Sequence, residues 1–307
     1  MKMARNLKCH IEGEDLTKSI DRLKKVDVFE ILKQESTFYE WMYYPICPFQ
    51  PVLENKNPKA FIDELPRESG VNSLDIPVMM GIVSDEGLLG SAPILVNKES
   101  TESFKKEVRE KYPLMFGFDH LKEELQERIK TEIDEFYFKD GHNYDLNNHQ
   151  NLTNLFSDAF FVSGFDEYLE KRLSQKSAET YVYILDHKPT ESMINLITED
   201  NESFGVTHGD ETRMLFPFPS GRYSEKDILL REAMVKMWVN FATYGNPTPS
   251  GSHSKWKPAT EYPWNYARLG SRDLNNWYIL DNENNFARER IEFWKKVNSM
   301  ISEGEKQ

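Results

Sequence analysis

Residues 76–87 read IPVMMGIVSDEG, and this stretch decides the fold class. Its first part, residues 76–83, is a continuous apolar run that ends at charged residues and Gly87. A strand that is buried on both faces of a sheet has this composition, whereas a strand with one solvated face alternates apolar and polar residues. The stretch therefore predicts a strand in a sheet that helices cover on both sides.

Helical and strand patterns alternate along the rest of the chain. Apolar residues at helical spacing predict helices over residues 15–35, 100–116, 120–138, 154–175, 224–245 and 287–301. Residues 180–188 and 276–282 favour strands because they are rich in β-branched and aromatic side chains. Strands that alternate with helices indicate an α/β fold. About three convincing strands are few for a chain of 307 residues, so it is expected to hold the edge half of a larger sheet.

Composition excludes several classes of function. The net charge of −13 argues against a nucleic-acid partner, because phosphate binding requires clustered Lys and Arg. The chain contains no apolar run of 18 residues, so no membrane span is expected, and its first residues lack the apolar core of a secretory signal. The two cysteines and seven histidines match no metal-ligand spacing. We therefore expect no metal and no cofactor.

A second stretch, FGVTHGDETRMLF at residues 204–216, contains the frame G-x-S-x-G of a hydrolase nucleophile elbow, with Thr207 in place of Ser. An elbow needs a buried strand before the nucleophile and a helix directly after it. Acidic and amide residues precede this segment, and Pro217, Pro219 and Gly221 interrupt any following helix. The elbow interpretation is rejected, which leaves His208 on a loop between glycines.

Four stretches in this order resemble the C-terminal half of the type-B carboxylesterases, the carboxylesterase and cholinesterase family of α/β-hydrolases. They are IPVMMGIVSDEGLL, NLFSDAFF leading to TYVYILDH, FGVTHGDETRMLF, and MVKMWVNFATYGNPTP. The resemblance runs from about residue 7 to the end and is strongest toward insect esterases. It implies an α/β-hydrolase sheet flanked by helices, with residues 1–307 forming one partial domain that lacks the nucleophile-elbow half.

The resemblance also implies roles for two residues. The acid that follows a strand in the family's S-x-E-G element corresponds to Glu86, with Asp85 as a rival, and the base of G-x-x-H-G corresponds to His208. Acyl transfer requires a serine activated by an imidazole, and a carboxylate that orients the imidazole. The chain order in α/β-hydrolases is serine, acid, histidine, which Glu86 and His208 obey.

The nucleophile is missing from this pattern, because no G-x-S-x-G occurs anywhere in the chain. We expect a carboxylic ester hydrolase that acts on a small-molecule ester, of which this chain is a C-terminal fragment that is inactive alone. The alternative is a non-catalytic cholinesterase-like interaction module, and a short isoform without catalytic function also stays open. The family leans toward secreted proteins, but the compartment and the ester substrate are left open.

Two further residues bear on the resemblance. Family members commonly pair a cysteine at the position of Cys9 with another about a dozen residues later, where this chain has Arg22. That disulfide cannot form, and a bond between Cys9 and Cys47 is not expected. Asp158 is interpreted as a buried structural acid, with a supporting place near the site as the alternative.

Overall fold

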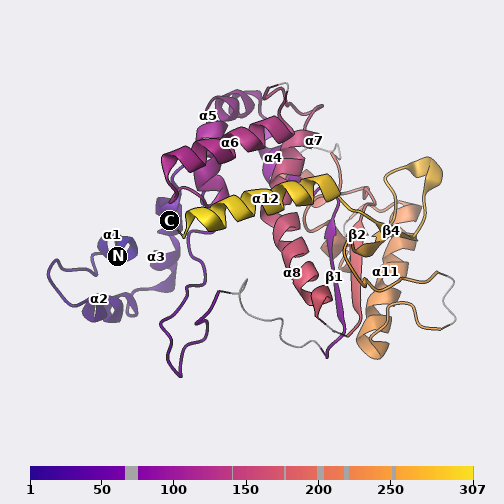
Figure 1. Ribbon diagram of the computed structural model, residues 1–307, viewed down its shortest axis with the longest axis horizontal. Helices are drawn as coiled ribbons and strands as arrows, with labels where there is room; N and C mark the ends of the chain where they lie inside the picture. Colours follow the sequence, from indigo (N-terminus) through magenta and orange to yellow (C-terminus); the bar gives the residue numbers. More distant parts are fainter. Residues whose placement is uncertain are drawn as a thin grey trace. The chain divides into compact units, whose positions relative to one another are not determined.

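The computed structural model describes residues 1–65, 75–139, 141–175, 178–198, 204–217, 221–250 and 254–306 (Figure 1). The chain divides into two compact units. Unit 1 consists of Met1–Glu64 and Glu110–His120, and unit 2 consists of Leu65–Arg109 and Leu121–Gln307. Each unit is described by itself.

Unit 1 is built from short helices. They are α1 (Lys2–Asn6), α2 (Leu16–Leu23), α3 (Val28–Leu32) and the 3₁₀ helix η1 (Glu35–Phe38), together with the last residues of α5 (Lys98–Phe116). The side chains of Asp15 and Asp27 cap α2 and α3 by accepting backbone N–H groups two residues later. The helical structure predicted over residues 15–35 is confirmed as this pair of capped helices.

Arg22 stands where the family resemblance places a second cysteine, and it makes polar contacts there. Its Nε donates a 2.8 Å hydrogen bond to the carbonyl oxygen of Cys9, and its guanidinium pairs with Glu14. Cys9 is buried, Cys47 is exposed, and both thiols are free. The expectation that these cysteines do not pair is confirmed.

Unit 2 contains a four-stranded mixed sheet in the order β1-β2-β3-β4. The strands are β1 (Val78–Val83), β2 (Thr180–Leu185), β3 (Asn265–Leu269) and β4 (Leu280–Asn284). β1 pairs in parallel with β2, β2 in parallel with β3, and β3 antiparallel with β4. Because the first three strands run in one direction, their carboxyl ends meet at one edge of the sheet, where loops can converge on a site.

Both faces of the sheet are covered, as the apolar run at residues 76–83 predicted. Tyr183 and Leu185 of β2 pack in one cluster with Met234 of α11 (Glu225–Tyr244), whereas Val182 and Ile184 pack in another with residues of α8 (Ser163–Ser174) and α12 (Arg288–Gly304). Figure 1 shows α11 on one side of the strands and α8 on the other. Alternate side chains of a strand point to opposite faces, so β2 is buried on both.

The remaining elements of unit 2 are helices. They are α4 (Leu88–Leu95), the first part of α5, α6 (Glu123–Tyr137), α7 (Gln150–Ser157), the π-helix η2 (Asp158–Val162), α9 (Met193–Thr198), α10 (Asp210–Leu215) and the 3₁₀ helix η3 (Leu274–Asn276). Ser224 caps α11 in a reciprocal capping box with Asp227, and Gly245 is its C-cap. The predicted start and end of this helix are therefore confirmed.

Several details differ from the sequence-based expectation, and among them the short helices α1, α4 and α9 were not predicted. The strand β3 was not predicted, and the strand expected over residues 276–282 lies at Leu280–Asn284. The helix α10 follows His208 although two prolines and a glycine were expected to prevent one. Pro217 lies after the last residue of α10, so a helix of six residues ends before the proline can interrupt it.

Candidate functional site

Glu86 lies just beyond the carboxyl end of β1 and is held by the strand that precedes it. Its Oε1 accepts the backbone N–H of Val83 at 2.9 Å, and the residue is only 3% exposed. The next residue, Gly87, lies so close to α7 that a Cβ at this position would be 2.2 Å from the carbonyl oxygen of Thr153. Glycine in the S-x-E-G element therefore lets the chain turn tightly against α7, with the glutamate at the edge of the sheet.

His208 meets Glu86 at this edge. Its Nδ1 is 2.7 Å from Oε2 of Glu86, although 122 residues separate the two in sequence. The imidazole side chain is 46% exposed, and within the described ranges its Nε2 has no hydrogen-bond partner. A carboxylate bound to Nδ1 fixes the tautomer that leaves Nε2 able to accept a proton. The two residues that the sequence singled out are thus in direct contact, and the imidazole is about half exposed.

The protonation of the pair follows from its surroundings. The hydrogen bond that His208 donates to Glu86 raises the pKa of His208, against the lowering effect of burial, and the charges of Glu86 and Glu211 add to the increase. Burial also raises the pKa of Glu211 itself. An imidazole whose cation is stabilised by a buried carboxylate is suited to take up a proton during a reaction and to release it later.

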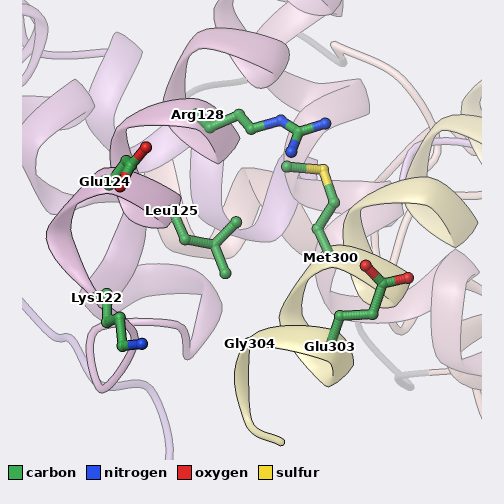
Figure 2. Close-up of a pocket in the computed structure, with 7 residues that line it drawn as sticks. All are labelled: Lys122, Glu124, Leu125, Arg128, Met300, Glu303 and Gly304. Carbon is green, nitrogen blue, oxygen red and sulfur yellow. The ribbon is translucent and has the colours of Figure 1, made fainter. Parts of the chain in front are cut away.

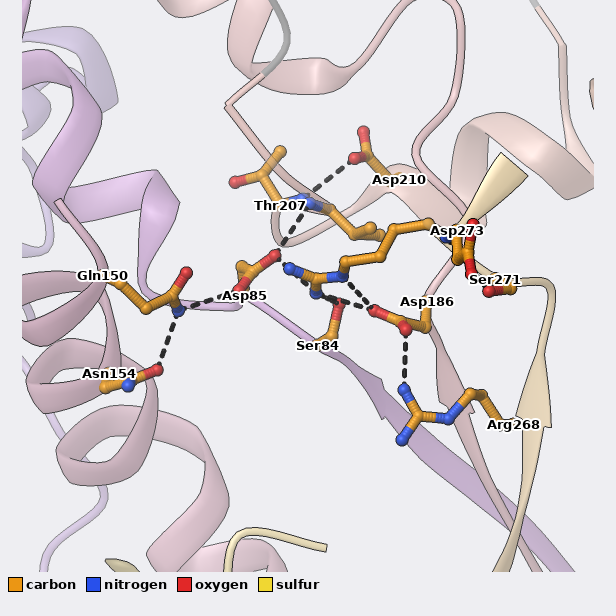
Figure 3. A network of polar contacts seen from close by, with 12 residues as sticks. Ser84, Asp85, Gln150, Asn154, Asp186, Thr207, Asp210, Arg268, Ser271 and Asp273 are labelled. Carbon is orange, nitrogen blue, oxygen red and sulfur yellow. Dashed lines mark hydrogen bonds and ion pairs between the residues drawn. The ribbon is translucent and has the colours of Figure 1, made fainter. Parts of the chain in front are cut away.

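Asp85, the rival acid, is occupied by other partners. Its Oδ2 accepts the backbone N–H of Val206 at 3.1 Å and pairs with Arg272 at 3.0 Å, and its Oδ1 accepts from Gln150 at 3.1 Å. Figure 3 shows Asp85 between Gln150 and the loop that carries Thr207. Within the described part of the chain its carboxylate does not bind His208. The geometry therefore favours Glu86 as the partner of the imidazole.

The loop before His208 is packed tightly rather than free. A Cβ on Gly205 would lie 2.5 Å from Oδ2 of Asp85, so only glycine allows this close approach. Thr207 is fully buried and its hydroxyl oxygen lacks a partner among the described residues. A buried hydroxyl cannot reach a substrate, which agrees with the rejection of Thr207 as a nucleophile.

Asp210 anchors the other side of the same loop. Its carboxylate accepts the backbone N–H of Thr207 at 2.9 Å and that of Met193 at 2.7 Å, and it also accepts the hydroxyl of Ser192. Burial raises the pKa of Asp210 to about 6. The histidine is thus carried by a short segment that two buried carboxylates, Asp85 and Asp210, hold by its backbone.

Phe161 packs against the imidazole from the π-helix η2. The centroids of the Phe161 and His208 rings are 4.8 Å apart, and the planes are inclined by 37°. A π-turn inside a longer helix displaces the residues that follow it, and such turns often occur at functional sites. Asp158, in the same segment, is bound instead by the Tyr137 hydroxyl at 2.6 Å and by Arg290 at 3.3 Å. This supports its interpretation as a structural acid.

Sequence reasoning missed Phe161, Asp210, Arg272 and Gln150 as neighbours of the pair. The one local signal was the sequence HGDE, in which Asp210 and Glu211 directly follow the histidine and its glycine. Phe161 and Arg272 carry no such signal because they reach the site from elements that are distant in the chain.

Other features of unit 2 lie away from this site. A pocket between the start of α6 and the end of α12 is lined by Lys122, Glu124, Leu125, Arg128, Met300, Glu303 and Gly304 (Figure 2). Neither residue of the pair contributes to it. In the ranges that the structure covers, no cluster of three or more His, Cys, Asp or Glu residues could hold a metal ion. No helix there is long and apolar enough to cross a bilayer.

Comparison with known proteins gives consistent matches. The model of the carboxylesterase family matches residues 1–294. The juvenile hormone esterase of Tribolium castaneum is 26% identical, over 90% of this chain and 51% of its own length. Venom carboxylesterase-6 of Apis mellifera is 25% identical, over 96% of this chain and 53% of its own. The chain thus spans about half the length of these relatives.

A solved structure shares the fold. The crystal structure of juvenile hormone esterase from Manduca sexta, with OTFP covalently attached, superposes with a TM-score of 0.71. The match covers 97% of this chain and 55% of that one, at 16% sequence identity. The α/β class that the sequence predicted is therefore confirmed, with the sheet and helices of an esterase of this fold.

Proposed function

This chain belongs to the carboxylesterase family, as an esterase of insect type, and we propose that it carries the base and the acid of a serine esterase, His208 and Glu86. The observation that carries this proposal is the 2.7 Å contact between His208 Nδ1 and Glu86 Oε2, in an imidazole side chain that is 46% exposed. A purely structural histidine gains nothing from this exposure.

In the proposed reaction, Nε2 of His208 takes the proton of a serine hydroxyl while the serine oxygen attacks the ester carbonyl carbon. The imidazolium then gives that proton to the departing alcohol, which leaves an acyl-enzyme. In the second half, His208 takes a proton from water, which attacks the acyl carbon, and returns it to the serine oxygen. Glu86 holds the ring and stabilises its cation in both halves.

The serine has to come from a segment other than residues 1–307. We propose that these residues are the C-terminal part of one carboxylesterase domain, since the chain contains no G-x-S-x-G and spans about half of its relatives. Loss of the nucleophile removes roughly 10⁶-fold of the rate in serine hydrolases. The 307-residue chain alone is therefore expected to hydrolyse no ester measurably.

The substrate class that we propose is a small carboxylic ester, and it rests on the match to the carboxylesterase family, because a serine with an imidazole base can also cleave amides. The selectivity for acyl and alcohol groups depends on the shape of the pocket, part of which the other half would build. A non-catalytic interaction module is the alternative, and it is disfavoured because a binding module gains nothing from a base paired with a buried acid.

The first test is the intact mass of the native protein. It can be captured from its source with an antibody against residues 287–296, ARERIEFWKK, after denaturation. A mass clearly above 36.1 kDa, with upstream peptides that contain G-x-S-x-G, would support the proposal. A mass of 36.1 kDa would overturn the assignment of esterase activity to the native protein.

The second test uses p-nitrophenyl butyrate as the substrate. If the longer protein is found, His208→Gln in that protein should lower kcat by about 10⁴-fold or more while leaving the protein folded. Unchanged turnover in this variant would show that another group is the base. The 307-residue chain by itself serves as the blank.

A further inference from the structure

Arg272 bridges the carboxyl ends of two strands from a position just after a third. It follows β3, and its Nε donates to Oδ1 of Asp186, directly after β2, at 2.8 Å. Its Nη2 donates to the Ser84 hydroxyl at 2.6 Å and to Oδ2 of Asp85 at 3.0 Å. Ser84 and Asp85 are the two residues between β1 and Glu86. One side chain therefore fixes the corner of the chain from which Glu86 projects.

The carboxylate that Arg272 binds also holds the histidine loop. Oδ2 of Asp85 accepts the N–H of Val206, and the N–H of Asp85 donates to the carbonyl oxygen of Val206, both at 3.1 Å. Val206 lies two residues before His208. This double link ties the backbone of the histidine loop to the residue that directly precedes Glu86. Figure 3 shows the contacts of Asp85 and Asp186 at this edge.

The buried carboxylates of Asp85 and Asp186 make this arrangement depend on the positive charge of Arg272. Asp85 is 2% exposed and Asp186 is 3% exposed, so each carboxylate needs hydrogen-bond or ion-pair partners to offset the cost of its burial. Asp186 has a second cation, because Arg268 Nη1 donates to its Oδ2 at 2.6 Å. Arg272 is the cation that is paired with Asp85 in the described part of the chain. Removal of Arg272 would leave Asp85 buried beside Asp186 without that charge.

We propose that Arg272 is a positioning residue for the Glu86–His208 pair, because it holds Asp85 where that carboxylate binds the backbone of the histidine loop. The consequence is that the distance from Nδ1 to Oε2 depends on a residue that touches neither atom. The relevance of this to catalysis rests on the function proposed above for His208, whereas the geometric claim can be tested without any turnover.

The test is the pKa of His208, measured by NMR on the 307-residue chain labelled with ¹³C at histidine. The His208→Gln spectrum assigns the signal among the seven histidines. Arg272→Gln is compared with a matched control, Arg268→Gln, which also removes an ion pair with Asp186 but leaves Asp85 untouched. The thermal unfolding midpoints of both variants are also measured, so that the loss of stability caused by each substitution can be compared.

The direction of the change separates two explanations. If Arg272 positions the pair, Arg272→Gln loosens the contact with Glu86, and the pKa of His208 falls by about half a unit or more toward its ordinary value. If Arg272 acts only as a neighbouring positive charge, its removal raises the pKa of His208 or leaves it unchanged. Arg268→Gln should leave this pKa within about 0.2 unit of the unsubstituted chain.

A rise or no change in Arg272→Gln, or an equal fall in both variants, would overturn the proposal. If Arg272→Gln does not fold, Arg272→Lys replaces it, because one ammonium group cannot bridge both carboxylates as the guanidinium does. The lysine variant should then give a smaller fall in the same direction, and an unchanged pKa of His208 in that variant would overturn the proposal as well. These outcomes do not depend on esterase activity, so they test the positioning role of Arg272 even if the proposed function is wrong.

Discussion

Among the carboxylate–imidazole pairs that the structure describes in unit 2, the two with the shortest contacts differ in what surrounds them. In the first, His208 Nδ1 lies 2.7 Å from Glu86; in the second, His187 Nε2 lies 2.6 Å from Asp227. The His208 side chain is 46% exposed and that of His187 is 2% exposed. Nδ1 of His187 accepts the indole N–H of Trp277 at 3.2 Å, so both of its nitrogens are occupied.

The comparison shows that a short contact with an acid does not by itself identify a base. A histidine that transfers protons needs one nitrogen held and the other accessible. The His187–Asp227 pair is closed on both sides and joins the end of β2 to the start of α11, where Asp227 also belongs to the capping box. The family motif points to His208 and not to His187, and the structure shows the difference in burial and in the Trp277 contact that occupies Nδ1 of His187.

The largest expected difference between the pairs is in stability. Asp227→Ala should lower the free energy of unfolding by about 3–5 kcal/mol, because it leaves buried polar groups on His187 and Thr190 without their acceptor. Glu86→Ala should cost about 1–3 kcal/mol, because the half-exposed imidazole can turn to water. Urea unfolding at pH 7 measures both. Equal losses would mean that exposure does not distinguish the pairs.

A second difference lies in the buried acids that hold the two regions. Burial raises the pKa of Asp227, but hydrogen bonds from His187, Thr190 and Ser224 more than offset this, so its net pKa is lowered. The pKa of Asp210, beside His208, is raised from 3.8 to about 6. Because folded Asp210 binds its proton more tightly than unfolded Asp210, its contribution to stability falls as the pH rises from about 4 to about 6.

The corresponding experiment compares the unsubstituted chain with Asp210→Asn. Between pH 4 and pH 7, the unsubstituted chain should lose about 3 kcal/mol of unfolding free energy relative to the Asp210→Asn variant. Unfolding curves at intervals of half a pH unit give the slope. A difference that does not change with pH would show that Asp210 is ionised in the folded chain over the whole interval.

The smallest effect concerns chemical reactivity. Diethyl pyrocarbonate should modify His208 on the order of tenfold or more faster than His187, because His187 reacts only after local opening of the core. Peptide mass spectrometry of a time course at pH 7 follows both residues in one sample. Similar rates would indicate that the closed pair opens readily, and the contrast between the two would then fail.

Much of this molecule could be predicted from local patterns. The apolar run at residues 76–83 predicted the strand β1, of which Ile82 and Val83 are buried, and the helix predicted over residues 224–245 is α11 with its two caps. The motifs that contain Glu86 and His208 named two residues that the fold brings into contact. Their catalytic role stays a prediction, since the contact alone does not test it.

The rest depended on tertiary packing, which no local pattern encodes. The strand β3 has polar residues at Asn265 and Arg268 and takes its place from pairing with β2 and β4. Phe161 reaches the imidazole because of a π-turn, and Arg272 reaches Asp85 because the chain reverses direction after β3. These positions are determined by neighbours that are 47 and 187 residues away in sequence.

The contact of Arg22 with Cys9 in unit 1 has a consequence for the conditions under which that unit holds together. Thiol reagents reduce a disulfide, and dissolved salt does not affect it. The guanidinium of Arg22, which binds Glu14 and a carbonyl oxygen, is unaffected by thiol reagents, but salt weakens its attraction to Glu14. The Arg22 contacts themselves therefore do not depend on the redox potential. Their sensitivity is to ionic strength, which screens the Arg22–Glu14 attraction without altering any covalent bond.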